Sequence, residues 1–239
     1  MKKTQNSRST SFLKKIFIKL CRLIGFEIID QANFRSPTLK KGLEETLSIP
    51  GKKSITIPLG QIDIKRKIKS FKIILRSCTS ELIMDQNKKR LFDCEKNEYT
   101  FRTLNSLIRS IKLAKDKFDN IKFDIIVTDT NSTQNDISKI KDLLDHSGIS
   151  SKFISIDLKK FENKIKTGYS KAKFSNMANF YNSLLIAKNE DADIIYFVED
   201  DYIHHLNSIT EMIFSYEKFS TIFNKDLFLL PSDYPYLYT

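Results

Sequence analysis

The sequence predicts an α/β fold: a mostly parallel sheet with helices on both faces, preceded by an N-terminal basic amphipathic helix and a small β-hairpin. Two observations carry this prediction. From Phe71 onward, short runs of β-branched and aromatic residues alternate with longer segments whose apolar residues recur at helical spacing. Such alternation is typical of strand-helix-strand units, which make parallel sheets. The unbroken apolar run at residues 194–198 favours a central strand buried on both faces.

Residues 1–68 are predicted to form a separate N-terminal part. Residues 12–26 place their apolar side chains on one face of a helix. Such a basic amphipathic helix can lie on an anionic membrane surface, or its apolar stripe can pack on the domain behind it. Residues 1–10 are predicted to be disordered, and residues 30–50 are predicted to be a connector. Residues 54–64 are predicted to form the hairpin.

Residues 69–239 are predicted to form the main domain. Strands are expected at residues 71–76, 123–128, 153–156, 193–198 and 227–230. Helices are expected at residues 100–118, 175–188 and 207–219. A further helix is expected to begin near residue 136 and to end with Gly148 as its C-terminal cap. In the helix at 175–188, the spacing predicts that Met177, Tyr181, Leu184 and Leu185 face inward.

The net charge of +11 on 239 residues is concentrated at the N-terminus. Residues 1–26 contain no acid and seven basic residues: Lys2, Lys3, Arg8, Lys14, Lys15, Lys19 and Arg22. Subtracting these charges leaves about +4 for the rest, an ordinary surface. The charge pattern therefore argues against a nucleic-acid-binding domain, and no nucleic-acid partner is expected.

The three cysteines, Cys21, Cys78 and Cys94, are odd in number and lack metal-site spacing. They are interpreted as reduced thiols. The predicted location is the cytoplasm, with the N-terminal helix peripheral on the inner face of the plasma membrane.

Three acids, Glu199, Asp200 and Asp201, follow the apolar run at the end of its strand. Ligands of open α/β sheets bind beyond the carboxyl ends of the strands. In an extended chain Glu199 and Asp201 face one point while Asp200 turns aside. Two carboxylates suit a hard divalent cation that also binds phosphate oxygens. The alternative is that these acids, or Asn207, only cap the next helix.

Two common phosphate cradles are absent from the sequence, the G-x-G-x-x-G turn after the first strand and the G-x-x-x-x-G-K-[ST] loop. A nucleotide would therefore have to bind through other groups, and the candidate is a metal ion held by these acids. His204 and His205 closely follow the acids, but adjacent side chains diverge. A surface role is expected for both rather than metal binding.

Two segments resemble GT-A fold nucleotide-sugar glycosyltransferases. Ile125-Ile-Val-Thr-Asp-Thr-Asn-Ser-Thr133 is similar to their I-I-V-V-D-D-G-S-T segment, with Thr130 and Asn131 in place of the second Asp and the Gly. The acids at 199–201 resemble the D-x-D motif that follows a Y-I-x-F-L strand. Residues 102–106 are similar to the L-x-x-T-L-x-S-L segment after the first strand. The resemblance covers residues 71–231.

The resemblance implies a Rossmann-like GT-A domain with a bound Mn²⁺ or Mg²⁺ ion. It implies metal binding by Glu199 and Asp201, a nucleotide pocket lined by Arg76, Ser77, Thr79, Asp129 and Asp200, and diphosphate contacts from Lys171 and Lys173. Asp129 would bond the base or ribose, or alternatively end its strand in an Asx-turn. The two lysines have a solvated surface role as their alternative, because Met177-Ala-Asn179 stands where the family often has A-R-N.

The resemblance further implies an inverting hexosyl transfer from a nucleotide-diphosphate-sugar to a cell-envelope glycan or lipid-linked acceptor. Such a transfer needs a general base. In the family this acid lies well downstream of D-x-D, whereas 38 residues follow Asp201 here and Asp233 is the late acid after a predicted strand. The expectation is a C-terminally incomplete copy without its base. The alternative function is a non-catalytic nucleotide-sugar-binding or scaffold remnant.

Overall fold

The computed structural model describes residues 12–24, 53–56, 60–80, 94–165 and 168–231. The chain divides into two compact units, one made of residues 1–44, 87–89 and 230–239, the other of residues 45–86 and 90–229. The described element of the first unit is the helix α1, Phe12–Leu23. The second unit contains the sheet and also the hairpin, which was predicted to belong to the N-terminal part.

The hairpin is present as predicted. Strand β1 (Lys53–Thr56) pairs antiparallel with β2 (Gly60–Asp63). The predicted disorder at 1–10 and the connector at 30–50 lie outside the described residues.

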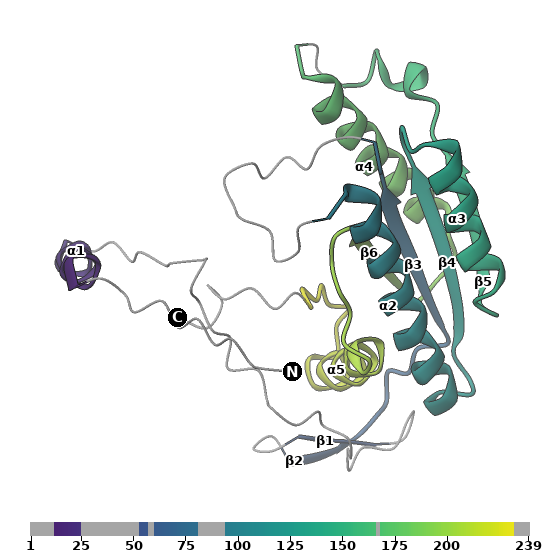
Figure 1. The fold of residues 1–239 in the computed structure, drawn as a ribbon. Helices are drawn as coiled ribbons and strands as arrows, with labels where there is room; N and C mark the ends of the chain where they lie inside the picture. Colours follow the sequence, from purple (N-terminus) through teal and green to yellow (C-terminus); the bar gives the residue numbers. More distant parts are fainter. Residues whose placement is uncertain (1–11, 25–52, 57–59, 81–93, 166–167, 232–239) are drawn as a thin grey trace, which may run out of the picture. The chain divides into compact units, whose positions relative to one another are not determined.

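Four parallel strands form the main sheet and confirm the α/β class. They are β3 (Ser70–Ser77), β4 (Lys122–Asp129), β5 (Ser150–Ser155) and β6 (Ile194–Glu199). Their order is β5-β4-β3-β6 (Figure 1), the first four positions of a Rossmann-like sheet. Because Ser77 is in register with Asp129 and Arg76 with Glu199, three strands end at the same edge.

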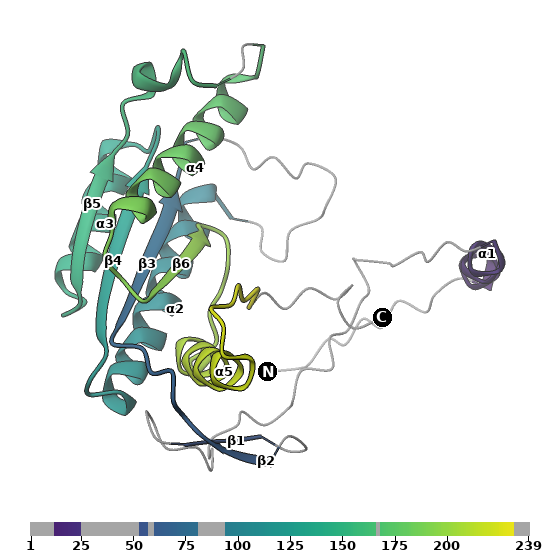
Figure 2. The same ribbon diagram turned by 180° about the vertical axis from the view of Figure 1, so that it is seen from behind.

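Helices cover both faces of the sheet. Helices α2 (Lys96–Lys117), α3 (Gln134–Asp145) and α5 (Ser208–Phe223) lie on one face, and α4 (Lys171–Asn189) lies on the other (Figures 1 and 2). A short 3₁₀ turn, Leu158–Phe161, precedes α4. Right-handed crossovers explain this division, because the steps to β4 and β5 run one way and the step back to β6 runs the other.

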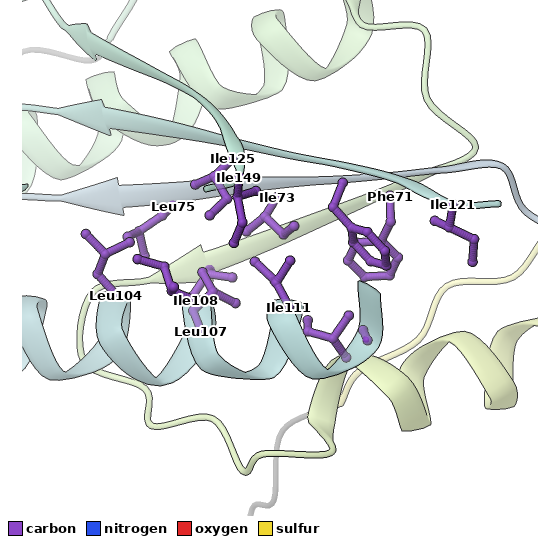
Figure 3. Packing of buried hydrophobic residues seen from close by; sticks show 14 of the residues in the cluster. Phe71, Ile73, Leu75, Leu104, Leu107, Ile108, Ile111, Ile121, Ile125 and Ile149 are labelled. Carbon is purple, nitrogen blue, oxygen red and sulfur yellow. The ribbon is translucent and has the colours of Figure 1, made fainter. Parts of the chain in front are cut away.

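The hydrophobic core lies between the sheet and the helices α2, α3 and α5, and Figure 3 shows the part between the sheet and α2. Alternate residues of β3 and β4, including Ile73, Leu75 and Ile125, point to this face and are fully buried. They pack against Leu104, Leu107, Ile108 and Ile111 of α2. This packing fixes the carboxyl ends of the central strands in place.

The prediction for the inward face of α4 is wrong. Met177, Tyr181, Leu184 and Leu185 are between 37% and 45% exposed. The residues that α4 buries are Ser175, Ala178, Asn179 and Ser183. The reason is the polar character of the strands opposite: Asn179 accepts a hydrogen bond from the Thr128 hydroxyl (2.7 Å) and donates to the carbonyls of Ser77 (3.2 Å) and Thr128 (3.0 Å).

The prediction that the apolar run forms a central strand buried on both faces is also wrong. Strand β6 lies at the edge of the sheet, and Phe197 is 41% exposed. Strands β3 and β4 have neighbours on both sides, and α4 packs on these two strands. Among the described residues, β6 is therefore less covered on its α4 side than β3 and β4 are.

Two smaller predictions need correction. Residues 227–230 form no strand, and the Phe228 side chain is fully exposed. The apolar character of these residues was not sufficient for them to pair with a neighbouring strand. His146, rather than Gly148, is the C-terminal cap of α3, and Gly148 adopts a positive φ of 68° in the turn before β5. None of the described helices has both the length and the apolar content needed to cross a membrane.

Candidate functional site at the carboxyl edge of the sheet

The strand order puts a topological switch point between β3 and β6. From β3 the chain moves outward through β4 and β5 on one side, then returns to β6 on the other. In open α/β sheets, ligands bind in the crevice outside the carboxyl ends of the strands at such a point. Arg76 and Glu199, which are register partners, lie there.

Asp200 is buried at this edge and joins three elements. Its carboxylate accepts hydrogen bonds from the backbone N–H of Cys78 (3.0 Å) and from the Thr100 hydroxyl (2.9 Å), and it forms an ion pair with Lys96. Cys78 follows β3, whereas Lys96 and Thr100 belong to the first turns of α2. Asp200 therefore ties the end of β6 to β3 and α2.

Glu199 points away from Asp200, as the alternation of side chains along a strand predicts. Its carboxylate forms an ion pair with Arg76, whose guanidinium lies 5.1 Å from the centre of the Phe180 ring of α4. About half of the Glu199 side chain is exposed. Asp201 lies half-buried in the turn after β6, where the strand has ended.

A divalent cation at this edge would depend on Glu199 and Asp201. Among the described residues there is no group of three or more His, Cys, Asp or Glu side chains arranged to hold a metal. Mg²⁺ and Mn²⁺ need no such group, because they accept one or two carboxylates together with water and phosphate oxygens. Glu199, half-exposed at the end of β6, and Asp201, half-buried in the turn that follows, are carboxylates of the kind that such a cation accepts when it arrives with a diphosphate.

Asp129 lies at the end of β4, but its carboxylate faces the protein interior. It accepts hydrogen bonds from the Ser77 hydroxyl (2.7 Å), the Ser132 backbone N–H (3.3 Å) and the Ser132 hydroxyl. Burial raises the pKa of Asp129, and the nearby charge of Asp200 adds to this effect. These contacts match the alternative prediction, a residue that ends a strand in a turn.

A second polar cluster beside Asp129 includes a residue that the sequence analysis missed. Asp136 of α3 is buried and accepts hydrogen bonds from the Thr79 hydroxyl (2.8 Å) and the Asn97 amide (3.2 Å). Burial alone would raise the pKa of Asp136, but these hydrogen bonds and one from Thr133 lower it below the usual value. Thr133 caps α3 by accepting from the backbone N–H of Asp136 (3.2 Å), so the spacing of a helix-capping pair was the available signal.

No model of a known protein family matches this sequence, and no curated protein matches it at a significant level. The geometry of the carboxyl edge is therefore the basis for a function.

Lys171 and Lys173 lie exposed in the first turn of α4. Ser170 caps this helix by accepting from the backbone N–H of Lys173 (3.3 Å), and the Lys173 ammonium lies 4.2 Å from the centre of the Tyr169 ring. The Asn131 amide donates to the Ser175 hydroxyl (3.2 Å), which ties the start of α4 to the turn after β4. The helix N-terminus therefore belongs to the carboxyl edge, where its backbone N–H groups favour an anion.

The predicted surface role is wrong for His204. Its side chain is buried, its Nε2 lies 3.0 Å from the Tyr196 hydroxyl, and its backbone N–H donates to the Ser106 hydroxyl (3.0 Å). The residue is held in the interior by these contacts with Tyr196, on the core side of β6, and with Ser106 of α2. Burial lowers the pKa of His204 to about 4, so the imidazole is neutral at pH 7. His205 is exposed, as expected.

Protonation of His204 should destabilise the protein in mild acid. The pKa of His204 in the folded state, about 4, lies below the unfolded value of 6.5, so the unfolded state takes up the proton first as pH falls. This stabilisation is complete above pH 6.5 and is lost between pH 6.5 and 4. Relative to His204→Gln, the wild type should lose roughly 2 kcal/mol of unfolding free energy between pH 7 and pH 5, measured by urea denaturation. Parallel pH profiles for the two proteins would contradict this assignment.

Proposed function

We propose that this protein is a metal-dependent glycosyltransferase of the GT-A type, which moves a sugar from a nucleotide-diphosphate-sugar to a glycan or lipid-linked acceptor. One observation carries the proposal: the order β5-β4-β3-β6 creates a switch point flanked by Arg76 of β3 and by Glu199 and the Asp201 turn of β6. An arginine and two carboxylates at this point suit a diphosphate together with a divalent cation.

Glu199 and Asp201 would hold Mn²⁺ or Mg²⁺, and the bound ion would neutralise charge on the leaving diphosphate. Arg76 supplies a second positive charge beside it, and the Phe180 ring helps to hold the guanidinium in position. The N-terminal turns of α2 and α4 add backbone N–H groups at the same edge. These features favour a leaving group that gains negative charge.

The turn after β4 is the candidate nucleoside contact. The Thr130 hydroxyl is buried in this turn and has no hydrogen-bond partner among the described residues. Asn131 adopts a positive φ of 59°, a conformation that asparagine tolerates in turns. We assign Asp129 a positioning role, because its hydrogen bonds to Ser77 and Ser132 hold this turn in place.

A non-catalytic nucleotide-sugar-binding protein is the second candidate. Three carboxylates at the edge favour it, because Asp129, Asp136 and Asp200 each accept hydrogen bonds from other groups of the protein. Such carboxylates stabilise a pocket but are poorly placed to accept a proton from an acceptor hydroxyl.

The proposal is tested by thermal shift with UDP, GDP, ADP and CDP, each with and without Mn²⁺. One nucleotide with Mn²⁺ should raise the melting temperature by several degrees, since a ligand at about 100 times its Kd adds roughly 2.7 kcal/mol. Asp201→Asn should abolish the metal-dependent part of the shift. Asp145→Asn, an exposed carboxylate at the end of α3, is the control and should leave it unchanged.

The outcomes separate the candidates. Absence of a shift with every nucleotide would overturn nucleotide binding. A shift that needs no metal and survives Asp201→Asn favours the non-catalytic protein. Metal-dependent hydrolysis of the matching nucleotide-diphosphate-sugar, lost in Asp201→Asn, supports the transferase.

A further inference from the structure

Helix α1 has two faces of different chemistry. Ile16, Phe17, Leu20, Leu23 and Ile24 follow the spacing that gathers residues on one side of a helix. Their side chains are between 42% and 77% exposed. Leu23 and Ile24 are among the most exposed apolar side chains of the described residues, and all five fall within nine consecutive positions.

The remaining polar positions of α1 are all basic. Positions 14, 15, 19 and 22 are lysine or arginine, and α1 contains no acid. In the sequence, positions 15, 19 and 22 follow one another at the four- and three-residue spacing of a helical stripe, and position 19 adjoins Ile16 and Leu23 at the edge of the apolar side. The wider segment 1–26 repeats this bias, with seven basic residues and no acid.

The described residues of α1 form a short helix. Its 12 residues extend about 18 Å at 1.5 Å per residue, whereas the hydrocarbon core is about 30 Å thick. A helix of this length with one apolar and one basic side can instead lie in the plane of the bilayer surface. Its apolar side then enters the acyl region while its basic side meets anionic headgroups.

We propose that α1 is a docking surface for an anionic lipid bilayer. Charge complementarity favours this partner, because a nucleic acid would satisfy the basic side but leave five apolar side chains in water. A second copy of α1 would cover the apolar side but bring together two helices that carry positive charge alone. An anionic bilayer satisfies both sides at once. This proposal is independent of the proposed function.

The test is co-sedimentation of the full chain with vesicles of phosphatidylcholine alone or with 30% phosphatidylglycerol. Binding to the anionic vesicles should be at least tenfold tighter and should weaken with salt. Leu20→Glu on the apolar side and Lys19→Glu on the basic side should each weaken binding by more than tenfold, because each removes one of the two attractions.

Two variants in the other unit are the matched controls. Leu184→Glu replaces a similarly exposed leucine of α4, and Lys112→Glu makes the same charge change on the exposed side of α2. Both should bind anionic vesicles within twofold of the wild type.

Three outcomes would overturn the proposal. Equal binding to neutral and anionic vesicles removes the role of charge. Loss of binding in Leu184→Glu but not in Leu20→Glu moves the surface to α4. A lower melting temperature of Leu20→Glu without lipid, or loss of a dimer in sedimentation velocity, shows that α1 packs on protein.

Discussion

Replacing Asp200 by alanine should lower the free energy of unfolding by about 3 kcal/mol. The change leaves the Lys96 ammonium without its partner in a site where both side chains are largely buried. It also removes the acceptor for the Cys78 N–H and the Thr100 hydroxyl. Unsatisfied buried donors and an unpaired charge are among the most destabilising changes a single substitution makes. Urea denaturation at pH 7 measures the effect.

The neighbouring Glu199 provides the matched control. About half of its side chain is exposed but its partner Arg76 is largely buried, so Glu199→Ala should cost about 1–2 kcal/mol, less than Asp200→Ala, whose pair is buried on both sides. Asp200→Asn keeps an acceptor oxygen but loses the charge, and should fall between the two. Equal losses for Asp200→Ala and Glu199→Ala would show that Asp200 does not join β6 to β3 and α2.

Glu199→Ala and Asp200→Asn should have the opposite order of effects on ligand binding from their order of effects on stability. If the proposed function is right, Glu199→Ala should weaken Mn²⁺-dependent nucleotide binding more than Asp200→Asn does, because Glu199 is the carboxylate assigned to the ion. This contrast separates carboxylates that hold the fold from those that hold a ligand.

The second large effect is expected at Asn179 of α4. Asn179→Leu keeps a similar volume but removes three hydrogen bonds, to the Thr128 hydroxyl and to the carbonyls of Ser77 and Thr128. At roughly 1 kcal/mol for each bond, the loss should be about 3 kcal/mol. Urea denaturation of the purified variant provides the measurement.

Asn176, one turn earlier on α4, is exposed and serves as control. Asn176→Leu should change the unfolding free energy by less than about 0.5 kcal/mol. An Asn179→Leu protein as stable as the wild type would mean that apolar contact, rather than hydrogen bonding, holds α4 on the sheet.

Much of the candidate site was predictable from the sequence, because a strand ending in acids is a local pattern. Glu199 and Asp129 lie at the ends of their strands, as expected, and Arg76 lies beside Glu199. The hydrogen-bond partners of the carboxylates at this edge were harder to predict from the sequence. Asp200 reaches the backbone N–H of Cys78, 122 positions earlier, and Asp129 reaches Ser77, 52 positions earlier. Residues so far apart leave no local periodicity to detect.

The sequence by itself determined the succession of strands and helices from β3 to α5, the acids after β6 and the basic, apolar-striped α1, because each depends on residues a few positions apart. The tertiary structure decided that β6 lies at the edge of the sheet, that α4 turns a polar stripe inward, and that Asp200 and Asp129 are used inside the protein. These outcomes follow from the order in which distant strands pair. That order decides which side chains find hydrogen-bond partners and which remain at the surface.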